Sequence, residues 1–80
     1  MDFGEAIKAL KEGKKVARKG WNGKGMYLYL VEGRVLAQKI GYGNYTFSGS
    51  IIMKTANNQL CIGWLASQGD ILAEDWEIVK

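Results

Sequence analysis

The sequence predicts an α+β fold: an N-terminal helix, then a mostly antiparallel β-sheet with a short helical turn before the last strand. Three observations predict it. Apolar residues recur at clear helical spacing near the N-terminus, strand-forming runs follow, and glycine and asparagine separate these runs at short intervals. No repeat or linker interrupts the 80 residues, so we expect a single small domain, residues 1–80.

The first element is a helix over residues 3–12. Asp2 is a typical N-cap, and Glu5, three residues later, completes a capping box. Gly13 is a natural C-terminal stop. The spacing i, i+3, i+4, i+7 places four apolar residues on one face of this helix: Phe3, Ala6, Ile7 and Leu10.

Strands follow the helix. Residues 14–19 form a short strand, and the glycine-rich segment 20–25 forms a loop that contains Trp21. Residues 26–31 and 34–40 are predicted to pair as a hairpin around Glu32-Gly33. The segment Gly41–Gly49 is a loop of a composition that often carries recognition.

The remaining elements complete the sheet. Residues 50–55 and 59–64 form strands joined by a turn at Asn57-Asn58. One or two helical turns over 67–73 are capped by Ser67 and Asp70. Residues 75–79 form the last strand, with Trp76 and Ile78 pointing inward.

Composition excludes several classes of function. The chain has no histidine and one cysteine, so Cys/His zinc sites, histidine-dependent nucleophiles and an internal disulfide are all ruled out. Cys61, between Leu60 and Ile62, is expected to be an inert buried thiol. We see neither a signal peptide nor a membrane span, and we expect a cytoplasmic protein.

The charge is uneven. The net charge of +3 combines nine basic and four acidic residues in 1–39 with two basic and four acidic residues in 40–80. This asymmetry would attract phosphates or bring subunits together, and it is equally typical of an ordinary solvated surface.

Binding groups outnumber catalytic ones. Trp64 and Trp76 bracket a polar run that contains Ser67, Gln68 and Asp70, a combination that suits a flat polar ligand. The structural interpretation is core tryptophans and helix-capping Ser and Asp. A hydrolase that uses Asp70 or Glu74 as its base is a weaker alternative.

We therefore expect no catalytic residues, no metal and no cofactor. Tyrosines and tryptophans offer stacking faces, while lysines and arginines offer charge for phosphates. The set fits a nucleotide-like ligand. It would also fit single-stranded nucleic acid or another interaction partner, which is the alternative function.

Several motifs appear in order along nearly the whole chain, notably Gly-Trp-Asn-Gly-Lys-Gly-Met at 20–26 and Trp-Leu-Ala-Ser-Gln at 64–68. With them the chain resembles the small phage and prophage family of the second Thoeris anti-defence protein. The resemblance implies a homotetramer that binds the cyclic ADP-ribose isomer of Thoeris, and in some members cyclic dinucleotides of the CBASS type. It implies sequestration inside the bacterial host cell without degradation, and no enzymatic activity.

The resemblance also suggests site residues. Trp21 or Trp64 would stack on adenine, Asn22, Ser67 and Gln68 would bond to ribose or base, and Arg18 and Lys24 would meet the diphosphate. Asp70 completes the set, and Trp76 belongs to the core. The Gly41–Gly49 segment matches none of the motifs on which the resemblance rests.

Overall fold

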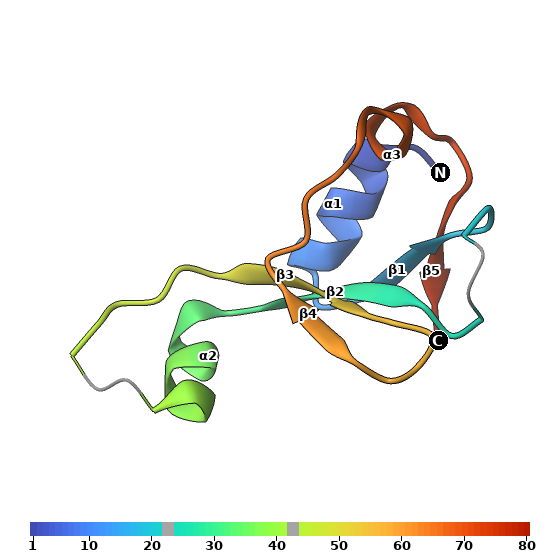
Figure 1. Ribbon diagram of the computed structural model, residues 1–80. Coiled ribbons are helices and arrows are strands. Elements are labelled where there is room, and N and C mark those ends of the chain that lie inside the picture. Colours follow the sequence, from blue (N-terminus) through green and yellow to red (C-terminus); the bar gives the residue numbers. More distant parts are fainter. Residues whose placement is uncertain (22–23, 42–43) are drawn as a thin grey trace.

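The computed structural model describes residues 1–21, 24–41 and 44–80, and its core is a five-stranded antiparallel sheet (Figure 1). The strands lie in the order β4-β3-β2-β1-β5. Helices α1 (Phe3–Lys11) and α3 (Gln68–Leu72) lie on one side of this sheet, and α2 (Gly33–Ile40) lies beyond the far end of β2. The strands are β1 (Lys15–Arg18), β2 (Tyr27–Val31), β3 (Ser50–Lys54), β4 (Leu60–Ile62) and β5 (Trp76–Val79).

Helix α1 begins as the sequence predicts. The Glu5 backbone N–H donates to the Asp2 carboxylate at 2.8 Å, and the Asp2 N–H donates to the Glu5 carboxylate at 3.0 Å. This reciprocal pair satisfies backbone donors that a helix start leaves free. The helix buries Ala6, Ala9 and Leu10 against the sheet.

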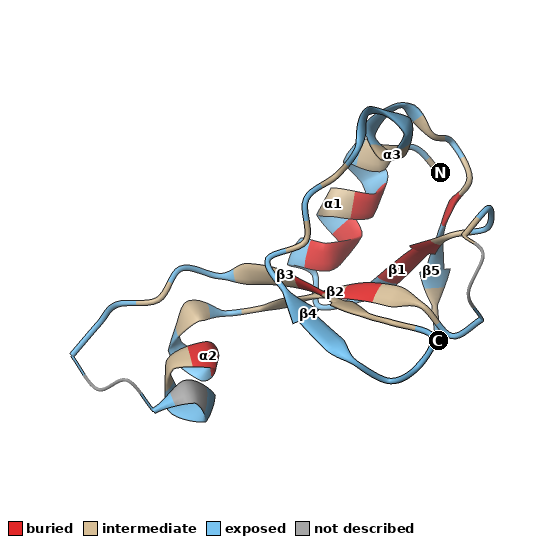
Figure 2. Ribbon diagram, in the orientation of Figure 1, coloured by how far each residue is buried: buried red, intermediate tan, exposed pale blue. Residues whose placement is uncertain are grey.

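The strand register divides the sheet into two faces. Val16 pairs with Leu28 on one side and with Ile78 on the other, and directly paired residues share a face. Val16 and Leu28 are fully buried under α1, where the core forms (Figure 2). Because side chains alternate along a strand, Tyr27 and Tyr29 point to the opposite face, which we call the open face.

The second strand of the predicted hairpin is wrong: residues 33–40 form α2, and β2 pairs with β3 instead. Val35-Leu36-Ala37 does not alternate as a strand facing water must, and most of the segment consists of good helix formers. Gly41 ends the helix with φ of +79° and donates its N–H to the Ala37 carbonyl at 2.9 Å.

Two predictions about burial are also wrong. Cys61 is exposed because β4 is an edge strand of the sheet and α1 does not extend over this position. Ile78 alternates with Trp76 on the α1 face, yet its side chain is 46% exposed, because β5 is the other edge. The other predicted strands, the turn at Asn57-Asn58 and the Ser67 cap are confirmed. No helix in the described ranges is long and apolar enough to cross a membrane.

At Gly33, the first residue of α2, the backbone of Phe47 passes very close to the helix. A Cβ atom at this position would lie 1.6 Å from the carbonyl oxygen of Phe47, which is backbone and has little room to move. The absence of a side chain therefore fixes how the segment leading to β3 crosses α2.

We predict that Gly33→Ala lowers the free energy of unfolding by about 1–3 kcal/mol, because the backbone at Phe47 must shift. Gly4→Ala is the matched control: it lies in α1, where a Cβ meets only ordinary contact, and should raise stability by about 0.5–1 kcal/mol. Urea unfolding monitored by tryptophan fluorescence measures both. Equal stability of Gly33→Ala and wild type would contradict the close approach.

Candidate functional site

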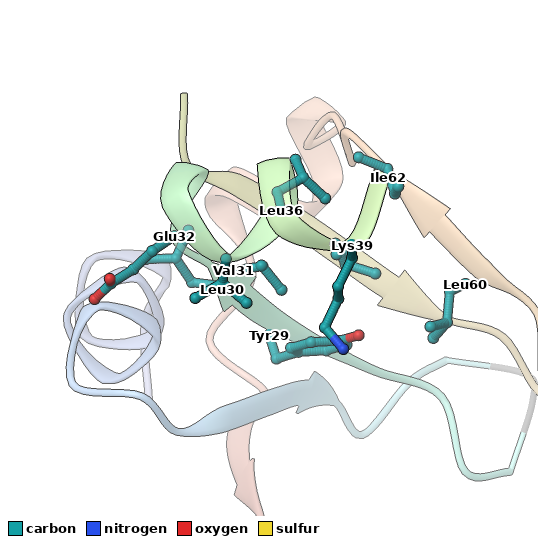
Figure 3. Close-up of a pocket in the computed structure, with 10 residues that line it drawn as sticks. Tyr29, Leu30, Val31, Glu32, Leu36, Lys39, Leu60 and Ile62 are labelled. Atoms are coloured by element: carbon teal, nitrogen blue, oxygen red, sulfur yellow. The ribbon is translucent and has the colours of Figure 1, made fainter. Parts of the chain in front are cut away.

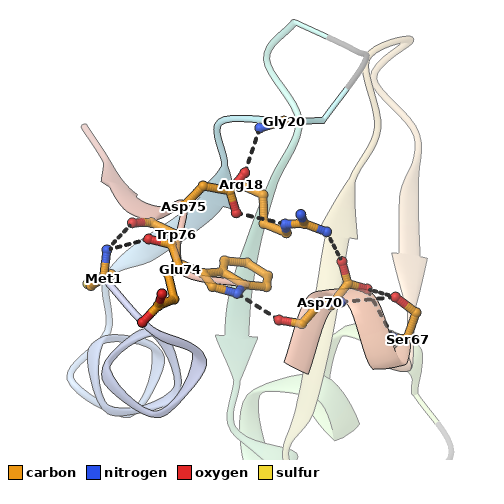
Figure 4. A network of polar contacts seen from close by, with 8 residues as sticks. All are labelled: Met1, Arg18, Gly20, Ser67, Asp70, Glu74, Asp75 and Trp76. Carbon is orange, nitrogen blue, oxygen red and sulfur yellow. Dashed lines mark hydrogen bonds and ion pairs between the residues drawn. The ribbon is translucent and has the colours of Figure 1, made fainter. Parts of the chain in front are cut away.

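A network of ion pairs joins β1 to the segment before β5. The Arg18 Nε lies 2.9 Å from Asp75 Oδ1, and its Nη1 lies 3.0 Å from Asp70 Oδ1 (Figure 4). Asp75 also accepts the Gly20 backbone N–H at 2.9 Å. One guanidinium thus bridges two carboxylates that are 52 and 57 residues away in the sequence.

Asp70 is held from a second direction by the start of α3. The Asp70 N–H donates to Ser67 Oγ at 3.1 Å, and the Ser67 N–H and hydroxyl both donate to Asp70 Oδ2. Trp76 Nε1 donates to the Asp70 backbone carbonyl at 2.9 Å. The predicted cap is therefore confirmed, and it is part of a larger network.

These contacts shift the acid–base properties of the network. Partial burial raises the pKa of Asp70, but hydrogen bonds from Ser67 and Arg18 outweigh it and hold the pKa below its ordinary value. The hydrogen bond from Arg18 lowers the pKa of Asp75 in the same way. Hydrogen bonds to Asp75 and Asp70 raise the pKa of Arg18 in return. All three groups stay charged at neutral pH.

The three tryptophans form one cluster with Trp76 at its centre. The ring centroids of Trp21 and Trp76 lie 5.4 Å apart, and those of Trp64 and Trp76 lie 6.2 Å apart, both in edge-to-face geometry. Trp76 is 1% exposed, which confirms its core assignment, whereas Trp21 and Trp64 are half-buried. Part of the Trp21 ring and part of the Trp64 ring therefore remain accessible for other contacts.

A hollow of about 450 Å³ lies beside β1 and β5, at described residues that follow β1 and precede β2. The hollow brings charged side chains and an aromatic ring together, a combination that suits a phosphorylated ligand. The lining residues are Ala17, Arg18, Lys19, Trp21, Lys24, Gly25, Met26, Glu77 and Val79. Three residues predicted for the site, Arg18, Trp21 and Lys24, thus meet in this hollow.

More positive charge lies beside this hollow, on the open face. The Lys15 and Lys54 ammonium groups lie 4.8 and 5.6 Å from the centroid of the Tyr27 ring. Lys54 Nζ also donates to the Gly25 carbonyl at 3.0 Å, which ties this cluster to the rim of the hollow. Lys15 is not among the site residues predicted from the sequence, because its place beside the Tyr27 ring depends on how β1 pairs with β2.

The remaining predicted residues lie elsewhere or cannot be placed. Ser67 and Asp70 are engaged in the α3 cap, and Gln68 is exposed at the start of α3. Trp64 lies against Trp21, with 6.5 Å between ring centroids. Asn22 lies outside the described residues.

A second, larger cavity of about 540 Å³ lies between α2 and the open face of the sheet (Figure 3). It is mostly apolar, with Lys39 and Glu32 at its borders. The incorrect hairpin concealed it, because a strand at 34–40 would have occupied the place of β3 beside β2. Its walls include Tyr29, Val31, Val35, Leu36, Ile52, Leu60 and Ile62.

Two observations bear on metal binding and acid–base chemistry. Within residues 1–21, 24–41 and 44–80, no three His, Cys, Asp or Glu side chains gather as a metal site requires. Of the two carboxylates considered as a base, Asp70 and Glu74, Asp70 is engaged by Arg18 and by the α3 cap.

Comparison with known proteins gives two matches along the chain. A family model described as Tad2-like, the Thoeris anti-defense 2-like domain, matches residues 1–79. The chain is also similar to the protein named Thoeris anti-defense 2 from Bacillus phage SP01. The two are 46% identical over 86 residues, an alignment that covers 100% of this chain and 96% of the relative.

The ion-pair network predicts a loss of stability in acid. The pKa values of Asp70 and Asp75 are lower in the folded protein than their ordinary value of 3.8, so the ionised carboxylates stabilise the fold fully above that pH. This stabilisation is lost as the pH falls through the folded-state pKa values. Asp75→Asn should be less stable than wild type at pH 7, and the difference should shrink as the pH falls below 3.8. Thermal unfolding between pH 2 and 7 measures this, with Glu12→Gln, in an exposed pair, as control. A constant difference across this range would contradict the prediction.

Proposed function

The chain belongs to the Thoeris anti-defense 2-like family, and from this premise we propose that it binds a cyclic nucleotide immune signal and holds it intact. The ligand proposed first is the cyclic ADP-ribose isomer of Thoeris, with cyclic dinucleotides of the CBASS type as further ligands. Tight binding lowers the free concentration of the messenger by mass action, so its effector is not triggered.

The observation that carries this proposal is the hollow of about 450 Å³ that Trp21 and Lys24 line together. Both residues come from the loop motif on which the family resemblance rests. The volume lies within the range of small-molecule sites, roughly 300–1,000 Å³. An aromatic ring and an exposed ammonium group in one hollow match a base and a phosphate on one ligand.

The phosphates of the ligand are assigned mainly to lysines. Arg18 already pairs with two carboxylates, so its charge is largely neutralised where it stands. Lys19 and Lys24 are exposed at the hollow, and Lys15 and Lys54 lie beside Tyr27 on the adjoining sheet. We assign the diphosphate first to Lys24, with Arg18 as a positioning residue that fixes the loop behind it.

The second motif segment is proposed to close the site from the α3 side. Trp64 contacts Trp21, so a ligand on the Trp21 ring comes within reach of this segment. Gln68 is exposed and retains its amide for a ribose or base edge, as is proposed for Asn22 in the first loop. Ser67 and Asp70 contribute by shaping α3.

Sequestration suits the site better than hydrolysis. A carboxylate whose pKa is depressed by Arg18 and Ser67 is a weak base at neutral pH, which disfavours Asp70 as a catalyst. The proposal includes a homotetramer acting in the cytoplasm of the bacterial host.

Calorimetric titration with the Thoeris cyclic ADP-ribose isomer, followed by a panel of cyclic dinucleotides, tests the proposal. We expect saturable binding, and mass spectrometry of ligand recovered after heat denaturation should show it unchanged. Conversion of the ligand would indicate an enzyme. No binding to any of these nucleotides would overturn the proposal.

We predict that Lys24→Glu weakens binding of this ligand roughly tenfold or more, equivalent to about 1.4 kcal/mol, because a charge-assisted phosphate contact becomes a repulsion. Lys8→Glu makes the same charge change on exposed α1, outside the lining of the hollow, and serves as the matched control. The same titration measures both variants. Equal effects of the two substitutions would point to net charge alone and would remove Lys24 from the site.

The Lys15–Tyr27–Lys54 cluster favours one alternative, binding of single-stranded nucleic acid. This function predicts oligonucleotide affinity that falls steeply as salt rises. Absence of oligonucleotide binding at low salt would exclude it.

A further inference from the structure

Lys54 lies next to the nucleotide hollow but differs from the lysines that line it. Its side chain is half-buried, whereas Lys19 and Lys24 are exposed. The Lys54 Nζ donates to the Gly25 carbonyl at 3.0 Å and lies 5.6 Å from the centroid of the Tyr27 ring. The ammonium group is therefore engaged within the protein, and one of its partners is a backbone group of the hollow itself.

The strand register explains how Lys54 reaches this backbone group. Lys54 is the last residue of β3 and pairs directly with Tyr27, the first residue of β2, so both side chains lie on the open face. Gly25 lies two residues before Tyr27 in the sequence. The long lysine side chain covers this distance, and a cation–π interaction with the Tyr27 ring favours the position of its ammonium group.

A similar contact restrains the backbone just after β1. There, Asp75 accepts the backbone N–H of the residue before Trp21. Just before β2, Lys54 donates to the carbonyl of Gly25, the residue after Lys24. The ring and the ammonium group assigned to the ligand are thus each next to a backbone group that a charged side chain from a distant part of the chain holds in place.

We propose that Lys54 is a positioning residue that holds Lys24 and Gly25 in the conformation that binds the ligand. Because a peptide group is planar, fixing the Gly25 carbonyl also fixes the bond between Gly25 and Met26. A backbone that is held before binding loses less conformational freedom when the ligand binds, so the affinity rises. The inference rests on the proposed function, since it concerns the lysine assigned to the diphosphate.

The ligand-free protein provides the first test. Lys54→Met keeps most of the side-chain length and removes the ammonium donors. The amide signal of Met26, which shares its peptide group with the Gly25 carbonyl, should shift in nitrogen–proton correlation spectra, and the amide of Lys24 should exchange faster with solvent. Lys8→Met, the same change on exposed α1, is the matched control and should leave these signals in place. Unchanged signals of residues 24–26 in Lys54→Met would overturn the proposal.

Titration with the Thoeris cyclic ADP-ribose isomer measures the effect on the site. Lys54→Met should weaken binding roughly three- to tenfold, because a smaller fraction of the protein is in the competent conformation. Lys54→Arg keeps a charged donor at this position and should recover most of the affinity, and Lys8→Met should bind like wild type. Wild-type affinity in Lys54→Met would contradict the proposed role.

A double-mutant cycle separates positioning from a direct contact with phosphate. A lysine that acts through Lys24 loses its effect when Lys24 is removed, so Lys54→Met should weaken binding much less in a Lys24→Met background than in wild type. Equal weakening in both backgrounds would mean that Lys54 contacts the ligand by itself, and would overturn the proposal. A wild-type chain that binds no nucleotide would remove the proposed function, whereas the spectra of the ligand-free protein would still decide whether Lys54 holds Gly25.

Discussion

The arrangement of this domain depends on the burial of Trp76. Its ring is 1% exposed and contacts Phe3 of α1, Trp21 and Trp64, while its indole N–H donates to the Asp70 carbonyl. A buried indole needs a partner for that N–H, and α3 supplies it. One side chain on β5 therefore determines where the N-terminal helix, the first loop and the second motif segment meet.

Arg18 extends this constraint from apolar packing to charge. Its planar guanidinium contacts Asp70 and Asp75 with separate nitrogens, which a lysine could not do in the same geometry. These ion pairs connect β1 to α3. Asp75 also accepts the backbone N–H of Gly20, so the start of the glycine-rich loop is restrained as well. Trp21 therefore directly follows a backbone position that an ion-paired carboxylate holds in place, and under the proposed function this restraint would favour a site formed before the ligand binds.

The sequence predicts the local part of this structure well. A capping box at Asp2 and Glu5, a cap at Ser67 and Asp70, a stripe of apolar residues and strand runs bounded by turns locate α1, α3 and most of the sheet, because each depends on residues within one element. Residues 34–40 were wrongly predicted as a strand, because a short run with three successive apolar residues is compatible with a strand or a helix. In the structure, β3 pairs with β2 instead. The contacts of Arg18 cross more than fifty residues, and no local pattern reveals which acids it meets. Sequence therefore selected Arg18, Trp21 and Lys24 for the site, but only the structure shows that Arg18 is already paired.

Under the proposed function, the pairing of Arg18 with two carboxylates would affect how the site binds a nucleotide. A guanidinium held by two carboxylates offers little net charge, so attraction for phosphate rests on the lysines around the hollow and the open face. Lysine ammonium groups act as point charges and impose little geometry, whereas aromatic rings accept any base on their faces. A protein that only withholds a messenger needs affinity and has no transition state to match, so charge and stacking without a catalytic base are sufficient. The same features explain how one hollow would accept related cyclic nucleotides, because selectivity then depends mainly on its shape.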